Sequence, residues 1–278
     1  MDSASESPNL FVPENSGSEA DSSVSQPLLS LRGLSKHFGA VQAMQNVDLD
    51  IPAGQVTALI GDNGAGKSTL IKTIAGIWAP SDGQILWKGK EVKIHSPRDA
   101  ADLGIATVYQ DLALCDNLDI VQNMYLGREE TRLGLLNEID MEIVTKKTLA
   151  DLSVTTVKSA RQLVGSLSGG QRQAVAVARA VMRESELVVL DEPTAALGVS
   201  QTAQVLELIR TLSSRGIAVL VISHNLVDVF AVADRIAVMY LGLLVNFGPV
   251  ANYDTASAVE LITTGSSGRV PSSFSSAS

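Results

Sequence analysis

The feature that most constrains the fold is a short stretch in which three glycines precede a lysine and a serine. Residues 61–68 read Gly-Asp-Asn-Gly-Ala-Gly-Lys-Ser, which fits the phosphate-loop pattern G-x-x-x-x-G-K-[ST]. An apolar run at 55–60 precedes it, and a pattern typical of a helix follows at 67–77. Glycines let the backbone wrap a phosphate with its N–H groups directed inward, and the helix start adds a partial positive charge. The order strand, loop, helix therefore predicts an α/β fold that binds a nucleotide.

The alternative for this stretch is a glycine-rich turn that caps a helix. Chance gives on the order of 0.01 matches to the pattern in a chain of this length, so we favour the nucleotide site. Lys67 is expected to reach the β and γ phosphates, and the Ser68 hydroxyl is expected to bind Mg²⁺. The nucleotide-binding residues predicted here are Gly61, Asp62, Asn63, Gly64, Ala65, Gly66, Lys67, Ser68 and Thr69.

The rest of the chain alternates short apolar runs with helical patterns, as α/β layers do. Nearly continuous apolar runs predict strands buried on both faces in a central sheet. Helices are predicted around them, and residues 112–165 break the alternation with helix-like pieces, which predicts an inserted helical subdomain. The predicted strands are 55–60, 105–109, 187–190 and 217–222, and the predicted helices are 67–77, 171–183 and 200–215.

Two carboxylates follow the predicted strand at 187–190, where open α/β sheets bind their ligands. Asp191 is suited to hold Mg²⁺, because this cation prefers oxygen ligands. Glu192 points elsewhere and could polarise an attacking water as a general base. The alternative is a strand that ends in a solvated acidic turn. With the phosphate loop upstream, we favour the catalytic interpretation.

Composition limits the function classes. The 278 residues include 21 Lys and Arg against 30 Asp and Glu, a formal net charge of −9, which argues against a nucleic-acid partner. The single cysteine, Cys115, cannot form a disulfide framework, so a reducing cytosolic setting is expected. The sequence predicts neither a secretory signal nor a spanning segment of about 20 apolar residues. Residues 1–27 and 264–278 are rich in serine and predict disordered tails around a body at 28–263.

Residues 167–171 read Leu-Ser-Gly-Gly-Gln at the start of a predicted helix. Ser168 and Gln171 also match a capping box, so a well-capped helix is the structural alternative. With this pentapeptide, the body of the chain closely resembles the ATP-binding cassette (ABC) ATPases of membrane transporters. The motifs occur in the family's order: phosphate loop, Gln110, Leu-Ser-Gly-Gly-Gln signature, Asp191 with Glu192, and His224. The resemblance implies a P-loop NTPase fold, with a RecA-like core sheet, an antiparallel β portion and the helical subdomain at about 112–165.

The resemblance also implies roles for residues that are uninformative alone. It implies a head-to-tail homodimer in which Ser168, Gly169, Gly170 and Gln171 of one subunit close over ATP held by the other. Gln110 resembles the family's Mg²⁺ ligand and nucleotide sensor, and His224 resembles its switch histidine at the γ-phosphate. Phe38, 29 residues before Lys67, occupies the position of an aromatic that stacks on adenine. Glu192, His224 and Gln110 are thus the expected catalytic residues, and Ser68, Gln110 and Asp191 the expected Mg²⁺ ligands.

Two departures accompany this resemblance. Gly198 stands where the family usually has an aspartate that touches the opposite site, and Asp62 fills a variable position of the phosphate loop. Segments 113–118, 123–128 and 194–199 resemble the ATPase subunits of bacterial monosaccharide importers of the fructose and ribose or xylose type.

That resemblance implies a peripheral ATPase subunit at the cytoplasmic face of the cell membrane. Its expected partners are a second copy, a separate transmembrane permease and, indirectly, an extracytoplasmic sugar-binding protein. Two alternatives remain at this point. One is a soluble ABC ATPase that acts on ribosomes or DNA, and the other is a P-loop kinase outside the ABC family, which has no use for the signature.

Overall fold

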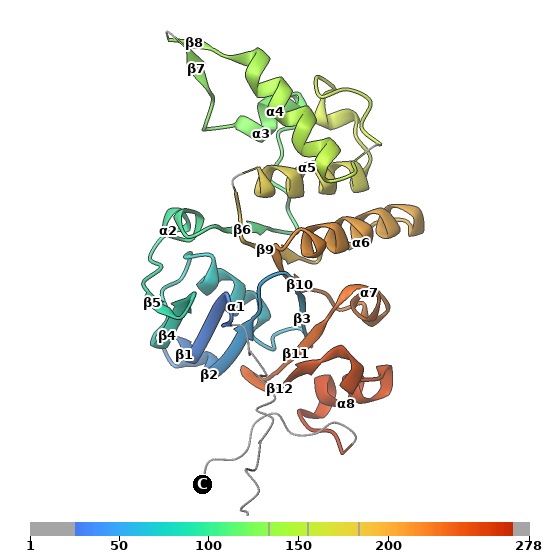
Figure 1. Ribbon diagram of the computed structural model, residues 1–278. Coiled ribbons are helices and arrows are strands. Elements are labelled where there is room, and N and C mark those ends of the chain that lie inside the picture. Colours follow the sequence, from blue (N-terminus) through green and yellow to red (C-terminus); the bar gives the residue numbers. More distant parts are fainter. Residues whose placement is uncertain (1–25, 133, 155, 183, 269–278) are drawn as a thin grey trace, which may run out of the picture.

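The computed structural model describes residues 26–132, 134–154, 156–182 and 184–268, and these form two main β-sheets, a short hairpin and eight α-helices (Figure 1). Disordered tails are predicted at 1–27 and 264–278, of which residues 1–25 and 269–278 lie outside the described residues. Within the described part, Thr264 is the last residue of a helix, Thr255–Thr264, so the C-terminal tail is predicted to begin one residue too early. The predicted α/β fold class is confirmed.

The larger sheet has the order β12-β11-β3-β10-β9-β6, and its strands are parallel except for the antiparallel edge strand β12. Its continuous apolar runs are explained by burial on two faces. Val188 and Leu190 pack into one hydrophobic cluster, while Leu187 and Val189 pack into another. The four strands predicted from the sequence differ from the observed ones by at most one residue at either end. The strands are β3 (Val56–Gly61), β6 (Ile105–Val108), β9 (Leu187–Asp191), β10 (Ala218–Ile222), β11 (Arg235–Tyr240) and β12 (Leu243–Pro249).

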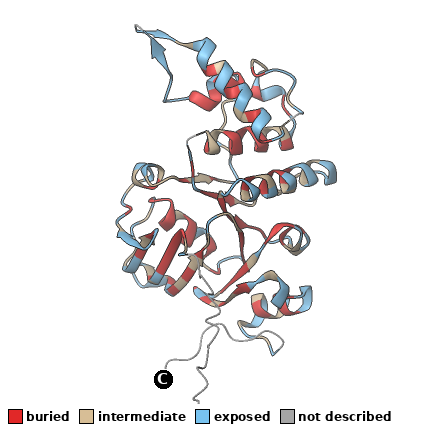
Figure 2. Cartoon of the chain, viewed as in Figure 1, coloured by how far each residue is buried: buried red, intermediate tan, exposed pale blue. Residues whose placement is uncertain are grey.

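The smaller sheet is antiparallel, with the order β2-β1-β4-β5, which confirms the antiparallel β portion. It packs together with α1 (Lys67–Ile74) in one hydrophobic cluster, and its buried strands lie beside that helix in Figure 2. Phe38 ends β1 and pairs with Val41 across the turn, so this end of the hairpin lies at the sheet's margin. The strands are β1 (Leu29–Phe38), β2 (Val41–Ile51), β4 (Asp82–Trp87) and β5 (Lys90–Val92).

The predicted helix at 67–77 is three residues too long, because α1 ends at Ile74. Gly76 has a φ of +73°, and a Cβ there would lie 2.3 Å from the Ser96 carbonyl oxygen, so the chain turns away. The helices predicted at 171–183 and 200–215 correspond to α5 and α6. Among the described residues, no helix has the length and apolarity needed to cross a bilayer. The other helices of the α/β body are α2 (Pro97–Asp102), α5 (Gly169–Val181), α6 (Val199–Ser214), α7 (Leu226–Val232) and α8 (Thr255–Thr264).

Residues 112–165 project at the end of the molecule opposite the antiparallel sheet (Figure 1). They contain α3 (Ile120–Tyr125), α4 (Glu138–Asp151) and the start of a 3-10 turn (Val164–Ser166). The sequence predicts helix-like pieces here, but two two-residue strands, β7 (Thr131–Arg132) and β8 (Leu135–Leu136), form a hairpin that it does not predict.

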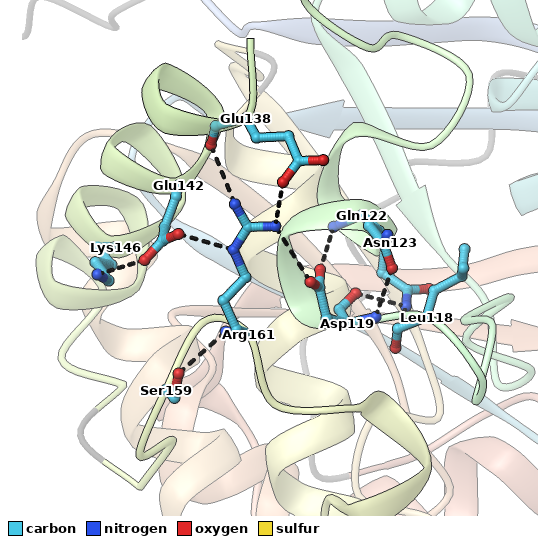
Figure 3. Close-up of polar contacts among 9 residues, drawn as sticks. All are labelled: Leu118, Asp119, Gln122, Asn123, Glu138, Glu142, Lys146, Ser159 and Arg161. Carbon is cyan, nitrogen blue, oxygen red and sulfur yellow. Dashed lines mark hydrogen bonds and ion pairs between the residues drawn. The ribbon is translucent and has the colours of Figure 1, made fainter. Parts of the chain in front are cut away.

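One arginine joins the pieces of this helical region (Figure 3). The Arg161 guanidinium lies 2.7 Å from Glu142, 3.0 Å from Glu138 and 3.4 Å from Asp119. Asp119 caps α3, whereas the two glutamates belong to α4. The loop that carries Arg161 leads to α5, so the network fixes both helices relative to the segment that precedes the signature.

Candidate active site

A cleft of about 760 Å³ opens where strands β3, β9 and β10 end. The carboxyl ends of parallel strands are where open α/β sheets bind their ligands. One wall of the cleft comes from β2 of the antiparallel sheet, so both sheets contribute to it. The lining residues are Val41, Gln42, Ala43, Gly61, Asp62, Asn63, Gly64, Gly66, Lys67, Ser68, Thr69, Gln110, Asp191, Glu192, Ala195, Ile222, His224, Leu241 and Gly242.

The phosphate loop forms the floor of this cleft, and two of its positions require glycine. A Cβ at Gly61, where φ is +156°, would lie 2.4 Å from the Met239 carbonyl oxygen. Gly66 has a φ of +102°, and a Cβ there would lie 2.8 Å from the Ala43 carbonyl oxygen. Gly66 is also the N-cap of α1 and supplies no side-chain cap, so the first-turn N–H groups have no side-chain partner. A helix start of this kind attracts anions.

Lys67 closes the loop. Its ammonium donates hydrogen bonds to the carbonyl oxygens of Gly61, at 2.8 Å, and Asp62, at 2.9 Å. Burial lowers the pKa of Lys67, and the negative charge of Glu192 is the largest influence in the opposite direction. The cleft thus holds a desolvated cation whose two acceptors are neutral carbonyl groups.

The two carboxylates that end β9 differ in environment. Burial raises the pKa of Asp191, and the neighbouring charge of Glu192 raises it further. Glu192 adopts a φ of +51°, which is uncommon outside glycine. Its N–H donates to the Ile222 carbonyl oxygen at 2.9 Å, which holds this backbone against β10.

Glu192 contacts His224, with 2.8 Å between Oε2 and Nδ1. The glutamate side chain is 17% exposed and the histidine 72%, so the pair spans the wall and mouth of the cleft. A second contact joins the segment after β9 to the first turn of α7, because Thr194 Oγ1 donates to Asp228 Oδ2 at 2.7 Å. The segment after β9 is therefore linked both to the loop after β10 and to the helix that follows that loop.

Most residues predicted from the sequence border the cleft, and three groups do not. Ala65 is buried beneath the phosphate loop. Phe38, at the end of β1, is 42% exposed and lies outside the lining, although its pairing partner Val41 is part of it. Gln110, by contrast, does border the cleft: it is exposed after β6 and lines the cleft together with Ser68.

The signature residues form the third group, since Ser168, Gly169, Gly170 and Gln171 are absent from the cleft lining of the described chain. Ser168 is the N-cap of α5 and forms a capping box with Gln171, with hydrogen bonds of 2.9 and 3.4 Å. A Cβ at Gly169 would lie 2.8 Å from Leu197 Cδ2. The capping box is therefore present, and one chain alone does not bring the signature to the cleft.

Comparison with known proteins assigns the family. The sequence pattern described as ABC transporter matches residues 44–195, more than half of the chain. The chain belongs to the ABC transporter family. Proteins of this type couple ATP hydrolysis to transport, so the chain is an ATPase.

Two relatives and one solved structure show how far the similarity extends. The fructose import ATP-binding protein FrcA of Rhizobium meliloti is 44% identical over 245 residues, covering 86% of this chain and 94% of the relative. The xylose/arabinose import ATP-binding protein XylG of Sulfolobus acidocaldarius is 45% identical over 243 residues, covering 87% and 96%. A solved ATP-binding cassette of an ABC transporter, 27% identical, has a TM-score of 0.75 and covers 84% of this chain and 98% of that one.

Several cleft residues of this ABC protein are not predicted from its sequence. Leu241 and Gly242 form the turn between β11 and β12, and Leu241 has a left-handed φ of +46°. The Gly242 N–H donates to the Ala65 carbonyl oxygen at 3.0 Å, so this turn supports the phosphate loop. The only local signal is Gly242 between two apolar runs, because Leu-Gly is not one of the usual hairpin pairs. Val41 to Ala43 reach the cleft only because the two sheets meet there.

Proposed function

We propose that this chain is the ATP-hydrolysing subunit of an ABC importer and that it energises uptake of a monosaccharide through a separate permease. One observation carries the proposal: a single cleft gathers the phosphate loop, Gln110, Asp191, Glu192 and His224. The sugar class is supported by the two sugar import relatives, which match over nearly their whole length. Neither relative is named as acting on ribosomes or DNA, so that alternative is not favoured.

ATP binding uses the phosphate loop and the start of α1. The triphosphate accepts hydrogen bonds from first-turn N–H groups and from the Lys67 ammonium, which exchanges neutral carbonyl acceptors for a charged one. Phe38, at the rim beside Val41, stacks on adenine. Stacking is tolerant of sequence and modest in strength, so the loop supplies most of the affinity.

Mg²⁺ binding is assigned to Ser68, Gln110 and Asp191. All three offer oxygen atoms and border the same cleft, which fits a hard cation. The described residues hold no cluster of three or more His, Cys, Asp or Glu side chains suited to a metal, so phosphate oxygens and water would complete the shell. When bound, Mg²⁺ neutralises the negative charge on the phosphate oxygens.

Hydrolysis uses the pair of Glu192 and His224. Glu192 accepts the proton of the attacking water as general base. His224, 2.8 Å away, orients that carboxylate and the water beside the γ-phosphate. The backbone bond from Glu192 to Ile222 fixes the base on the sheet while the exposed histidine can move.

The working unit is a homodimer that joins head to tail. The N-terminus of α5 carries N–H groups and a partial positive charge at Ser168, outside its own chain's cleft. A second copy supplies the ATP that this helix start covers. Signature residues 168–171 of each subunit thus complete the site of the other.

The other proposed partners are the proteins that an ABC importer needs besides its ATPase subunits. A transmembrane permease binds this subunit, and an extracytoplasmic sugar-binding protein delivers the sugar on the other side. The subunit is peripheral at the cytoplasmic face of the cell membrane. Co-purification of a permease supports this placement, whereas RNA or DNA in the preparation contradicts it.

The decisive experiment is Glu192→Gln, which keeps the shape of the side chain and removes the base. We expect ATP hydrolysis to fall by about 10² to 10⁴, the usual contribution of a general base. ATP-dependent dimerisation, measured by analytical ultracentrifugation, should persist. Lys67→Ala is the matched control, because it should lose both ATP binding and dimerisation. Unchanged turnover in Glu192→Gln would reject the assigned base.

A further inference from the structure

Two aromatic rings at the end of β1 contact each other and lie between two lysine side chains. The rings of Phe38 and Trp78 lie 4.8 Å apart at 74°, an edge-to-face arrangement. The Lys36 ammonium lies 5.1 Å from the Phe38 ring centre, and the Lys72 ammonium lies 4.7 Å from that of Trp78. Edge-to-face rings and cations over ring faces are favourable geometries. The orientation of the Phe38 ring is therefore set from its neighbours, while 42% of the residue stays exposed.

Trp78 is itself attached to the helix that begins in the phosphate loop. The N–H groups of Ile77 and Trp78 both donate to the Lys72 carbonyl oxygen, at 2.8 and 3.2 Å. Lys72 lies in α1, whose first residue is Lys67. A helix of eight residues is a rigid rod of about 12 Å. The indole is thus held at a fixed distance from the loop that takes the phosphates.

The segment after Trp78 is fixed to the strand that carries Phe38. Lys36 Nζ donates to the Ala79 carbonyl oxygen at 2.8 Å, and the Ser81 N–H donates to the Ser35 carbonyl oxygen at 2.8 Å. Phe38 belongs to the antiparallel sheet, whereas the phosphate loop follows a strand of the parallel sheet. Trp78 therefore connects the two sheets: its backbone N–H is hydrogen-bonded to Lys72 of α1, and its ring contacts Phe38 of the antiparallel sheet.

We propose that Trp78 is a positioning residue for the nucleotide base: it holds the Phe38 ring at the height above the phosphate loop at which adenine stacks. The inference rests on the proposed function, because it takes ATP as the ligand and Phe38 as the stacking residue. Trp78 does not touch the reacting phosphate. It acts on the base through Phe38 and leaves the chemistry at Glu192 unchanged.

An edge-to-face aromatic pair is worth roughly 0.5–1.5 kcal/mol, which corresponds to a change of about twofold to twelvefold in affinity. Trp78→Ala should therefore raise the KM for ATP by about twofold to twelvefold and leave kcat unchanged. Trp78→Phe keeps an aromatic edge and should restore most of the affinity. If Trp78 had only a structural role, its replacement would lower kcat as well as the affinity for ATP.

The critical control uses a ligand without a base. Binding of ATP and of inorganic tripolyphosphate is measured for the wild type, Trp78→Ala, Phe38→Ala and the double variant. Tripolyphosphate needs only the loop, so its affinity should be equal in all four. The double variant should bind ATP no more weakly than Phe38→Ala alone, because Trp78 acts through Phe38.

A spectroscopic test uses the fact that the chain has two tryptophans. In a Trp87→Phe background, Trp78 is the sole indole, and we expect ATP but not tripolyphosphate to change its fluorescence. The proposal is overturned if Trp78→Ala binds ATP like the wild type, if it loses both ligands equally, or if the double variant is additive. If Phe38→Ala alone leaves ATP binding intact, this inference fails while the ATPase assignment stands. If the wild type binds neither ligand, the proposed function itself fails.

Discussion

At the scale of single residues, the cleft contains titratable groups that are partly buried, although burial disfavours their charged forms. Burial raises the pKa of Asp191 and lowers the pKa of Lys67, and each charge partly relieves the other. Glu192 adds a left-handed backbone conformation, which costs of order 1–3 kcal/mol and persists only where the surrounding structure imposes it. Perturbed titratable groups and left-handed backbone conformations of this kind cluster at functional sites.

The raised pKa of Asp191 predicts a pH dependence for Mg²⁺ binding. As the proposed Mg²⁺ ligand, Asp191 must be ionised to hold the cation. Mg²⁺-dependent affinity for a non-hydrolysable ATP analogue should therefore fall with decreasing pH, through a value above the usual 3.9 or so of aspartate. More Mg²⁺ should move this fall to lower pH, since cation and proton compete for the same oxygen. Isothermal titration at several pH values measures both effects.

Asp191→Asn is the control for this prediction, because the analogue's own phosphate titrates in both proteins while only the wild type carries the carboxyl. The difference between the two pH profiles isolates Asp191. The sign for stability is also fixed: folding favours the neutral acid, so the stability that Asp191 contributes at low pH is lost as pH rises through its folded-state pKa. Asp191→Asn should therefore be the more thermally stable protein at neutral pH. If the wild type and Asp191→Asn have the same pH profile of Mg²⁺-dependent affinity, Asp191 is not the Mg²⁺ ligand.

Single residues also show what the sequence reveals. The phosphate loop is predictable because its chemistry requires consecutive residues at fixed spacing. The 2.8 Å contact of Glu192 with His224 and the bond from Glu192 to Ile222 are not, since they join separate strands. Trp78 could not be identified from the sequence, because its proposed role depends on its contact with Phe38, which lies 40 positions away.

At the scale of elements, helix α6 begins without a side-chain cap. Its N-cap is Gly198, which has ordinary extended angles (φ −73°, ψ 162°) and open space where a Cβ would lie. Gly198 stands where the family usually has an aspartate. An aspartate would fit there, and its carboxylate could accept hydrogen bonds from the free first-turn N–H groups of α6.

Gly198→Asp should therefore raise the free energy of unfolding by about 0.5–1 kcal/mol, through a better cap and a less flexible unfolded chain. Urea unfolding followed by circular dichroism measures this. Gly198→Ala is the matched control, since it restricts the unfolded chain equally but cannot cap, and it should be the less stable of the two variants. Equal stability of the aspartate and alanine variants would show that α6 needs no cap.

Elements differ in how well their sequence predicts them. Strands β3, β9 and β10 are predicted closely because both faces are buried, which demands continuous apolar residues. Strand β2 mixes exposed and buried residues without strict alternation, so its apolar pattern is weak. The β7–β8 hairpin has only two residues a strand and is exposed, too short for any periodicity. The hydrophobic pattern of a sequence reflects which side chains are buried, so elements that bury few side chains cannot be predicted from it.

At the scale of the whole molecule, each part contributes a different portion of one ligand site. The parallel sheet carries the phosphate loop and the acids, the antiparallel sheet brings Phe38 to the rim, and α5 carries the signature away from its own cleft. The first two portions meet within one chain. In the proposed head-to-tail dimer a second copy supplies the third, and hydrophobic patterning within one chain cannot place that copy.

This arrangement predicts complementation between two inactive variants. Lys67→Ala has no working phosphate loop but an intact signature. Ser168→Asp keeps the cap of α5, because aspartate caps as well as serine, yet places a negative charge opposite the triphosphate. Each variant alone should be inactive. Mixed subunits form hybrid dimers with one intact composite site. If each site works by itself, an equal mixture should recover about a quarter of the wild-type ATPase activity when the subunits pair at random and about half when only hybrids form.

Ser168→Asn is the control, since asparagine also caps the helix but adds no charge, and alone it should retain much more activity than Ser168→Asp. Recovery must also require contact between the two variants, so it should appear only after mixing and be absent when each variant is assayed alone at the same total concentration. A site contained within one chain predicts no recovery at any ratio. Recovery that peaks at equal amounts of the two variants is the pattern that only a shared site produces, because hybrid dimers are most abundant there.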